Sequence, residues 1–271
     1  MSACTIPNWQ PEDAVSVEDC STAYAVDTDP SATKDPDDRV AAIYMQHTCG
    51  KPQVVSATRG NVSAPRAFVN ALEIWPRDLV VRAADSCDSE LVKRYQKELW
   101  GQRLTILSIG SVRNIATLLS CQPRLSERIN EVVVVAGRTR GEEFWLNPRW
   151  RLFRPLRDLN FETDRDAMVT LLQSGVRVTF IPFASGSSIR VHPFELRFLP
   201  QAERVRVRNW SLTLLPVGGE GALPLFDVVA AAYVHDPRAF TCVAVRAQVG
   251  ERLVLQTVDR SHRGLFRLRA G

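Results

Sequence analysis

The stretch Glu131-Val-Val-Val-Val-Ala-Gly137 gives the clearest indication of the fold. Its four consecutive valines favour a β-strand, and a strand without polar alternation is typical of one covered on both faces, as in a parallel sheet. Outward from this stretch, strand-like and helix-like segments alternate along the chain. We therefore expect an α/β protein with a single doubly wound, mainly parallel, Rossmann-like sheet and helices on both faces.

The expected strands lie at residues 24–27, 53–58, 79–84, 104–110, 131–137, 177–182, 240–246 and 252–258. The expected helices lie at residues 38–46, 64–75, 89–100, 114–120, 163–173 and 224–233. Residues 1–21 contain prolines and acidic pairs without a clear period. We expect these residues to form an irregular leader, followed by one domain over residues 22–271.

The composition, with 45% hydrophobic and 24% charged residues, is that of an ordinary globular protein. The formal charge of +4 is spread over many arginines without a dense basic block, so we expect neither a nucleic-acid nor a membrane partner. No run approaches the roughly 18 apolar residues that span a bilayer. The six cysteines are scattered without a C-x-x-C pair, which predicts reduced thiols in a cytoplasmic protein.

An acidic stretch connects the first expected strand to the first expected helix. It reads Ala25-Val-Asp-Thr-Asp-Pro-Ser-Ala-Thr-Lys-Asp-Pro-Asp-Asp38. Five carboxylates packed together would repel one another, so they either separate into water or hold a metal ion. An acidic helix start, favourable by roughly 0.3–1 kcal/mol, accounts for Asp37 and Asp38 alone. It does not account for Asp27 and Asp29 at the strand end, nor for Asp227 in a late helix, so the set favours a metal.

Other polar or glycine positions also follow expected strands, namely Asn61, residues 110–114 and Gly137. In parallel α/β sheets the loops at the carboxyl ends of the strands build the ligand site. We therefore expect these positions and the aspartates to face one crevice. For Asn61 and Asn114, turn formation and helix capping are alternatives to a role in binding.

Several of these segments resemble motifs of the calcium-dependent nucleoside hydrolases of the inosine-uridine-preferring type. The similar segments, in order, are Asp27-Thr-Asp-Pro30 with Asp37-Asp38, Thr58-Arg-Gly-Asn61, Ser108-Ile-Gly-Ser-Val-Arg-Asn-Ile-Ala116, Val133-Val-Val-Ala-Gly137, Asp158-Leu-Asn160 and Leu225-Phe-Asp-Val-Val-Ala230. The resemblance covers about residues 22–245. It implies hydrolysis of the N-glycosidic bond of a (deoxy)ribonucleoside or related ribosyl compound by a homo-oligomer, either a dimer or a tetramer.

The resemblance also implies a metal site and a catalytic base. The carboxylates of Asp29, Asp38 and Asp227 and the backbone carbonyl of Arg113 would bind Ca²⁺, which prefers 6–8 oxygen ligands. Asp37 would then be the general base that activates a calcium-bound water.

The resemblance further places three sugar-binding residues. Asn61, Asp158 and Asn160 would hold the sugar hydroxyls and stabilise an oxocarbenium-like transition state. For Asp158 and Asn160 a capped loop is the alternative.

The sequence departs from the family pattern in several ways. Residues 31–36 contain a four-residue insertion, in which Asp35 is an additional candidate ligand. Asp158 replaces a glutamate. Phe226 stands where the family has a histidine, often assigned to protonating the leaving base. The aromatic stretch Phe144-Trp145 with Trp150 and Phe153 is our candidate for contacting the base, and loop packing is the alternative.

Two rival functions remain open from the sequence. One is a catalytically weakened protein that binds calcium, ribose or a nucleotide on the same fold. The other is a magnesium-dependent phosphatase of the haloacid-dehalogenase type, with Asp27 and Asp29 as its nucleophile pair. The second rival also needs a lysine and a second acidic pair, and the sequence does not place both.

Overall fold

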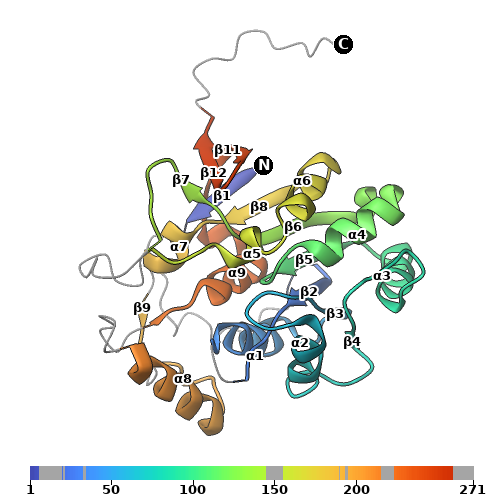
Figure 1. Ribbon diagram of the computed structural model, residues 1–271. Helices are drawn as coiled ribbons and strands as arrows, with labels where there is room; N and C mark the ends of the chain where they lie inside the picture. Colours follow the sequence, from blue (N-terminus) through green and yellow to red (C-terminus); the bar gives the residue numbers. More distant parts are fainter. Residues whose placement is uncertain are drawn as a thin grey trace.

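The computed structural model describes residues 1–5, 20, 22–32, 35–144, 155–188, 190–192, 195–214 and 223–258. Its main feature is a ten-stranded sheet with the order β4-β3-β2-β5-β6-β8-β1-β11-β12-β7 (Figure 1). The seven strands from β4 to β1 run parallel. They are β1 (Ser2–Thr5), β2 (Tyr24–Thr28), β3 (Val54–Ala57), β4 (Val80–Val81), β5 (Leu104–Ser108), β6 (Ile129–Val135) and β8 (Val178–Ile181).

The remaining strands extend one edge of this sheet. The long strand β11 (Thr241–Val249) pairs antiparallel with β1 and with β12 (Leu253–Thr257). The short β7 (Arg138–Thr139) pairs parallel with β12. A separate two-stranded sheet is formed by β9 (Arg190–Val191) and β10 (Leu223–Pro224).

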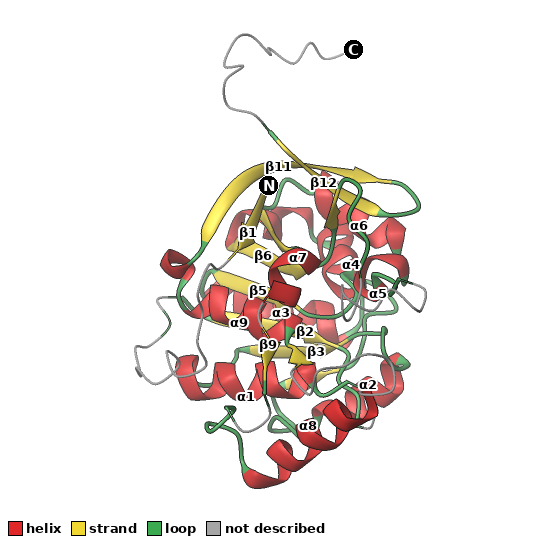
Figure 2. Ribbon diagram, turned by 90° about the vertical axis from the view of Figure 1, so that its left-hand side faces the viewer, coloured by secondary structure: helices red, strands yellow, loops and turns green. Residues whose placement is uncertain are grey.

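Helices cover both faces of the sheet (Figures 1 and 2). Successive side chains of a strand point to opposite faces, so Val133 and Val135 pack in one apolar core while Val132 and Val134 pack in the other. The first core includes α1 (Asp37–Cys49), α2 (Ala64–Ala71) and α9 (Phe226–His235). The second includes α3 (Glu90–Gly101), α4 (Arg113–Cys121) and α6 (Arg165–Gln173). The expected doubly wound, mainly parallel fold is confirmed.

The other helices are short or lie away from the sheet. They are α5 (Leu159–Glu162), α7 (Phe183–Ser188), α8 (Gln201–Leu214) and the 3₁₀ helices η2 (Pro123–Arg128) and η4 (Pro237–Ala239). The sequence pattern predicts neither α7 nor α8. The strand predicted at residues 79–84 is also too long, because only Val80 and Val81 form β4.

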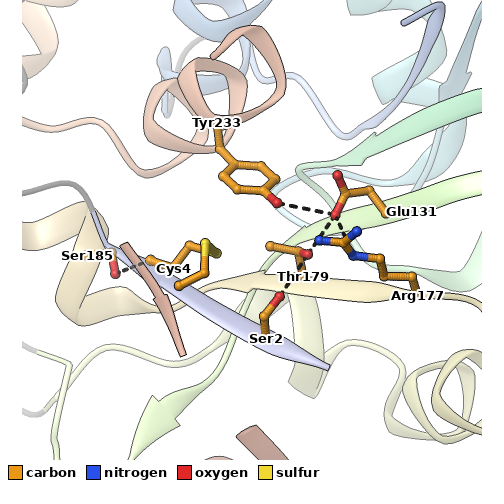
Figure 3. Close-up of a disulfide and its surroundings, with 8 residues drawn as sticks. Ser2, Cys4, Glu131, Arg177, Thr179, Ser185 and Tyr233 are labelled. Atoms are coloured by element: carbon orange, nitrogen blue, oxygen red, sulfur yellow. Dashed lines mark hydrogen bonds and ion pairs between the residues drawn. A yellow bond between two sulfur atoms is a disulfide. The ribbon is translucent and has the colours of Figure 1, made fainter. Parts of the chain in front are cut away.

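Residues 2–5 do not belong to an irregular leader, which corrects that expectation for this segment. They form β1, which inserts between β8 and β11. The hydroxyls of Ser2 and Thr179 lie 3.1 Å apart, and the Ser185 hydroxyl donates to the Cys4 carbonyl at 2.8 Å (Figure 3). Residues 6–19 and 21 lie outside the described residues.

The expectation of reduced cysteines is also wrong. All six cysteines are paired, as Cys4–Cys242, Cys20–Cys49 and Cys87–Cys121. The spacing of the cysteines in the sequence does not predict these pairs, because the paired residues are brought together only by the folded structure. Disulfides are typical of oxidising compartments, so the pairing removes one support of the cytoplasmic prediction, which itself stays untested. Among the described residues, no helix is long and apolar enough to cross a bilayer.

Candidate active site

The acidic stretch lies where the carboxyl end of β2 meets the beginning of α1. Asp29 follows β2 directly, and α1 begins at Asp37 and Asp38 after Pro36. Proline ahead of the first helical turn is compatible with helix initiation, and the two carboxylates face the positive end of the helix dipole. All three aspartates are buried, at 1–4% exposure, so they do not separate into water.

Backbone amides and one hydroxyl hold two of these carboxylates in place. The Thr28 hydroxyl donates to Asp38, which also accepts the Asp29 amide at 3.1 Å. The backbone amide of Asn61 donates to Asp29 Oδ2. Gly60 and Gly110 pass so close to the Asp29 carboxylate that a Cβ at either position would overlap it. Loops after three neighbouring strands therefore converge on Asp29, as expected from the strand order.

A second group of carboxylates is linked through backbone amides. The amide of Asp227, in the first turn of α9, donates to Asp37 Oδ2 at 3.0 Å. The amide of Asp37 donates to Asp35 Oδ1 at 3.1 Å. The inserted aspartate thus joins the cluster, and Asp227 reaches it from a position 190 residues away in sequence.

The carboxylates of this cluster are crowded together away from water. Burial, and then the charge of Asp38, raises the pKa of Asp29 well above its usual range. Burial and then Asp35 raise the pKa of Asp37, and burial and then Asp37 raise the pKa of Asp227. Burial raises the pKa of Asp38 to about 7. Asp29 Oδ1 and Asp37 Oδ1 are both buried without a hydrogen-bond partner among the described residues.

These features fit a bound hard cation. Buried carboxylate oxygens without donors normally have an explanation, and an ion is one of the few available. Within the described ranges, no group of three or more His, Cys, Asp or Glu side chains already stands in ligand geometry. Backbone amides occupy the other oxygen of Asp29 and of Asp37, which leaves Oδ1 of each to a ligand, and Asp27 Oδ2 is another buried carboxylate oxygen without a hydrogen-bond partner in the described residues.

Asp27 stands behind this cluster. Its Oδ1 accepts the Ser56 hydroxyl at 2.6 Å and the Asn114 side-chain amide at 2.8 Å, and burial raises the pKa of Asp27 to about 7. Asn114 Oδ1 accepts the Ala84 amide at 3.0 Å. Both ends of the Asn114 side chain are therefore used within the protein, so it positions its neighbours instead of capping a helix.

The inserted loop is anchored by α8. Arg206 donates to the carbonyl of Ala32 at 2.5 Å. Glu203, from the same helix, pairs with the buried guanidinium of Arg39 through bonds of 2.7 and 3.2 Å. Arg39 follows the acidic pair in α1. The helix α8 therefore holds both the inserted loop, through Arg206, and α1, through Glu203.

A cavity of about 430 Å³ opens beside the acidic cluster. Its polar lining residues are Asp35, Asp37, Asn61, Arg157, Asn160 and Asp227. Its apolar lining residues are Ile109, Val135, Phe144, Leu156, Leu159, Phe183, Trp210, Pro224 and Phe226. This volume falls within the range of small-molecule sites, and the combination of convergent polar groups with an apolar wall is typical of them.

The two residues of the Asp158-Leu-Asn160 motif have different surroundings. Asn160 lines the cavity, and its side-chain amide donates to the Val135 carbonyl at 2.9 Å. Asp158 does not line it. Its two oxygens accept the amides of Gly137, at 2.8 Å, and Phe161, at 3.1 Å, so that it caps α5. The capped-loop alternative therefore describes Asp158, and sugar binding by either residue stays a prediction.

Arg113 is the first residue of α4. Its carbonyl accepts the Thr117 hydroxyl at 3.0 Å, and its exposed guanidinium pairs with Asp164 at 3.0 Å. A helical carbonyl points along the axis toward the carboxyl end of its helix. None of the contacts of the acidic cluster given above involves this carbonyl, so its role as a metal ligand stays a prediction.

Three phenylalanines form the aromatic wall. Phe144 stacks on Phe183 with ring centroids 4.2 Å apart, and Phe226 meets Phe144 edge-on at 4.9 Å. The sequence indicates Phe144 and Phe226 but not Phe183 and Trp210. The latter two lie in helices, α7 and α8, that the pattern does not predict. The other aromatics expected to contact a base, at 145, 150 and 153, lie outside the described residues.

One family model matches the sequence, and several solved structures share the fold. Residues 78–264 match the sequence model described as inosine-uridine preferring nucleoside hydrolase. The fold is similar to a plant nucleoside hydrolase, PpNRh1, with a TM-score of 0.72 and 15% identity over 91% of this chain and 90% of that chain. It is also similar to a purine-preferring ribonucleoside hydrolase from Gardnerella vaginalis, with a TM-score of 0.66 and 18% identity over 89% of each chain.

A third similar structure is the type III effector protein XopQ in complex with adenosine diphosphate ribose, with a TM-score of 0.59 and 15% identity over 89% of this chain and 88% of that chain. No curated protein matches the sequence at a significant level. The sequence match begins after the acidic stretch, whereas the structural matches cover most of the chain.

Proposed function

The chain belongs to the inosine-uridine preferring nucleoside hydrolase family, and we propose that it hydrolyses the N-glycosidic bond of a (deoxy)ribonucleoside or a related ribosyl compound. One observation carries the proposal. Two buried carboxylate oxygens, of Asp29 and Asp37, lack a partner among the described residues and belong to an acidic cluster beside a cavity that can hold a nucleoside.

We infer that the cation is calcium. Asp29, Asp38 and Asp227 supply carboxylate oxygens, the donor type that calcium prefers, and the family resemblance adds the Arg113 carbonyl. When bound, calcium would lower the pKa of a coordinated water and hold sugar hydroxyls.

Asp37 is the proposed general base. Its Oδ2 is fixed by the Asp227 amide, whereas Oδ1 has no donor in the described part of the chain and is the atom that can take a proton from water. Asp37 also lines the cavity, which supports its proposed role in activating a water that attacks the anomeric carbon.

The sugar would lie between the acidic cluster and α5. The Asn160 amide nitrogen is held by the Val135 carbonyl, which leaves its Oδ1 to accept a sugar hydroxyl. Asn61 borders the cavity next to Asp29 and would hold a second hydroxyl. Asp158 caps the helix that presents Asn160, so it supports sugar binding through that helix. Fixed dipoles of this kind stabilise an oxocarbenium-like transition state.

The test is release of free ribose from a panel of nucleosides, with calcium and after chelation. We expect release that chelation abolishes and calcium restores. Release that persists after chelation would contradict the metal assignment. Calcium and ribose binding without release from any compound would favour the binding-protein alternative. Light scattering would test the proposed homo-oligomer, a dimer or a tetramer.

A further inference from the structure

A second cavity, of about 940 Å³, adjoins the cavity beside the acidic cluster. Its described lining consists of residues 31–32 of the inserted loop, residues 59–66, Asn70 and Thr163. We call it the α2 cavity, because residues 63–66 are the N-cap and the first turn of that helix. Asn61 lines both cavities, so the two meet at this residue.

We propose that the α2 cavity binds a phosphoryl group on the 5′ oxygen of the ribosyl substrate, and that the substrate class is therefore the nucleoside 5′-phosphates. This inference rests on the proposed function, which places the ribose next to Asn61. The phosphoryl group takes no part in the bonds that form and break. It adds binding energy at a distance from the anomeric carbon.

The α2 cavity carries positive charge without a carboxylate of its own. Arg59 and Arg66 line it, and its described lining contains no aspartate or glutamate. Arg59 donates to the Thr163 carbonyl at 3.3 Å, and within the described ranges neither guanidinium pairs with a carboxylate. Two such guanidinium groups favour an anion, and the planar fork of donors on arginine matches the oxygens of a phosphoryl group.

The cavity beside the acidic cluster has the opposite character. Three aspartates line it, and the arginine in its described lining, Arg157, pairs with Glu162 at 2.7 Å. Asp29 lies at the border of the two cavities, because its Oδ2 accepts the backbone amide of Asn61. The cation of the proposed function offsets the charge of Asp29 and so favours an anionic group nearby. A phosphorylated ribosyl compound therefore meets positive charge on both sides of its sugar.

The walls of the α2 cavity are fixed by hydrogen bonds within the protein. The buried side-chain amide of Asn70 donates to the Pro30 carbonyl at 2.7 Å, which ties the beginning of the inserted loop to α2. Arg206 of α8 holds the Ala32 carbonyl from the other side. The Ser63 side chain forms no capping hydrogen bond to the first turn of α2, and helix beginnings favour anions. The cavity is thus formed before a ligand arrives, as is usual for small-molecule sites.

The shape of a ribosyl compound leaves its 5′ oxygen for this cavity. In the proposed function the anomeric carbon faces the water activated by Asp37, and the 2′ and 3′ hydroxyls face the cation and the two asparagines. The base then lies against the aromatic wall. The 5′ oxygen is the remaining substituent of the sugar, and the α2 cavity is the neighbouring space on the Asn61 side.

The decisive experiment compares matched substrates on the full chain with calcium. The pairs are inosine with inosine 5′-monophosphate and uridine with uridine 5′-monophosphate, and release of the free base is measured. We expect kcat/KM to be at least tenfold higher for the phosphorylated member of a pair. A smaller preference or none would overturn the inference, and hydrolysis of the nucleosides themselves would then leave the proposed function intact.

Substitutions of the two arginines test whether the preference arises in the α2 cavity. The double variant Arg59→Gln/Arg66→Gln should lower the ratio of the two kcat/KM values at least tenfold. Arg124→Gln is the matched control and should leave the ratio unchanged, since this exposed arginine lies in η2, directly before β6 and so at the amino ends of the parallel strands. An unchanged ratio in the double variant would place the phosphoryl group elsewhere and overturn the inference.

A binding measurement separates the failure of this inference from that of the proposed function. In the Asp37→Asn variant, isothermal titration should show at least tenfold tighter binding of ribose 5-phosphate than of ribose, and the added substitutions of Arg59 and Arg66 should remove the difference. Equal affinities would overturn the inference. The expected difference, found for a protein that releases no base from any of the four substrates, would support the phosphoryl site and overturn the proposed function.

Discussion

The acidic side of the cavity and its aromatic side are built in different ways. On the acidic side, carboxylates at the end of β2 and the beginnings of α1 and α9 are fixed by backbone amides. On the aromatic side, rings from α7, α9 and the chain after β7 hold one another. The backbone at the strand and helix ends therefore positions the carboxylates, whereas side chains on separate elements form the aromatic side. Exchanging a ring is less disruptive than moving a carboxylate.

The largest expected effect is on the acidic side. Asp37→Asn removes the proposed base and keeps the side-chain volume, so kcat should fall by about 10²–10⁴ for every substrate. Ribose release measures it. Asp236→Asn, at a partly exposed aspartate that pairs with Arg238 away from the cavity lining, is the matched control and should leave kcat unchanged. A fall in kcat for only one substrate would instead indicate that Asp37 contacts the base of that substrate.

The buried carboxylates of the acidic side should also make the stability of the calcium-free protein depend on pH. Burial raises the pKa values of Asp27 and Asp38 to about 7, above the unfolded value of about 3.9. Between these values the folded state binds more protons than the unfolded state, so the free energy of unfolding falls as pH rises from about 4 to about 7. Calorimetry with chelator should show a lower Tm at pH 7.5 than at pH 5. Calcium should remove this trend, and a Tm that rises with pH without calcium would contradict it.

Two disulfides distinguish the acidic side from the far face of the sheet. Cys20–Cys49 ties the chain before β2 to the end of α1, whereas Cys87–Cys121 joins the loop after β4 to α4. Replacing either pair by serines should cost about 2–4 kcal/mol in the free energy of unfolding. Only loss of the first should also weaken calcium binding, measured by isothermal titration. A thiol assay on the native protein should find no free cysteine.

A smaller effect is expected from Asp158→Ala. The change leaves the amides of Gly137 and Phe161 without acceptors, so the free energy of unfolding should fall by about 1–3 kcal/mol. Because Asp158 does not line the cavity, kcat/KM should change less than tenfold. Unchanged stability with a 100-fold loss of kcat/KM would show direct contact with the sugar.

The smallest effect is expected on the aromatic side. Phe183→Leu removes the stack on Phe144, and an aromatic pair contributes about 0.5–1.5 kcal/mol. KM for the preferred substrate should rise severalfold with kcat unchanged. A matching fall in kcat would mean that the ring also positions the reacting bond.

The sequence predicts the acidic side better than the aromatic side, for a physical reason. Strand ends and helix starts leave a local pattern, so Asp29, Asp37 and Asp38 can be placed from that pattern alone. Phe183 and Trp210 reach the cavity through helices without a clear apolar period, and no spacing rule points to them. The disulfides and β1 escape prediction because they depend on partners that only the fold brings together, across as many as 238 residues.

The position of β1 has a consequence for biosynthesis. Residues 2–5 pair with Thr179 and Phe180 on one side and with residues 241–244 on the other. This segment leaves the ribosome long before either of its neighbours exists. Contacts of such high sequence separation slow folding, and the edge of β1 that faces β11 stays unpaired until β11 has been synthesised. Premature termination anywhere before β11 would leave an unpaired strand edge, a substrate for chaperones or for aggregation.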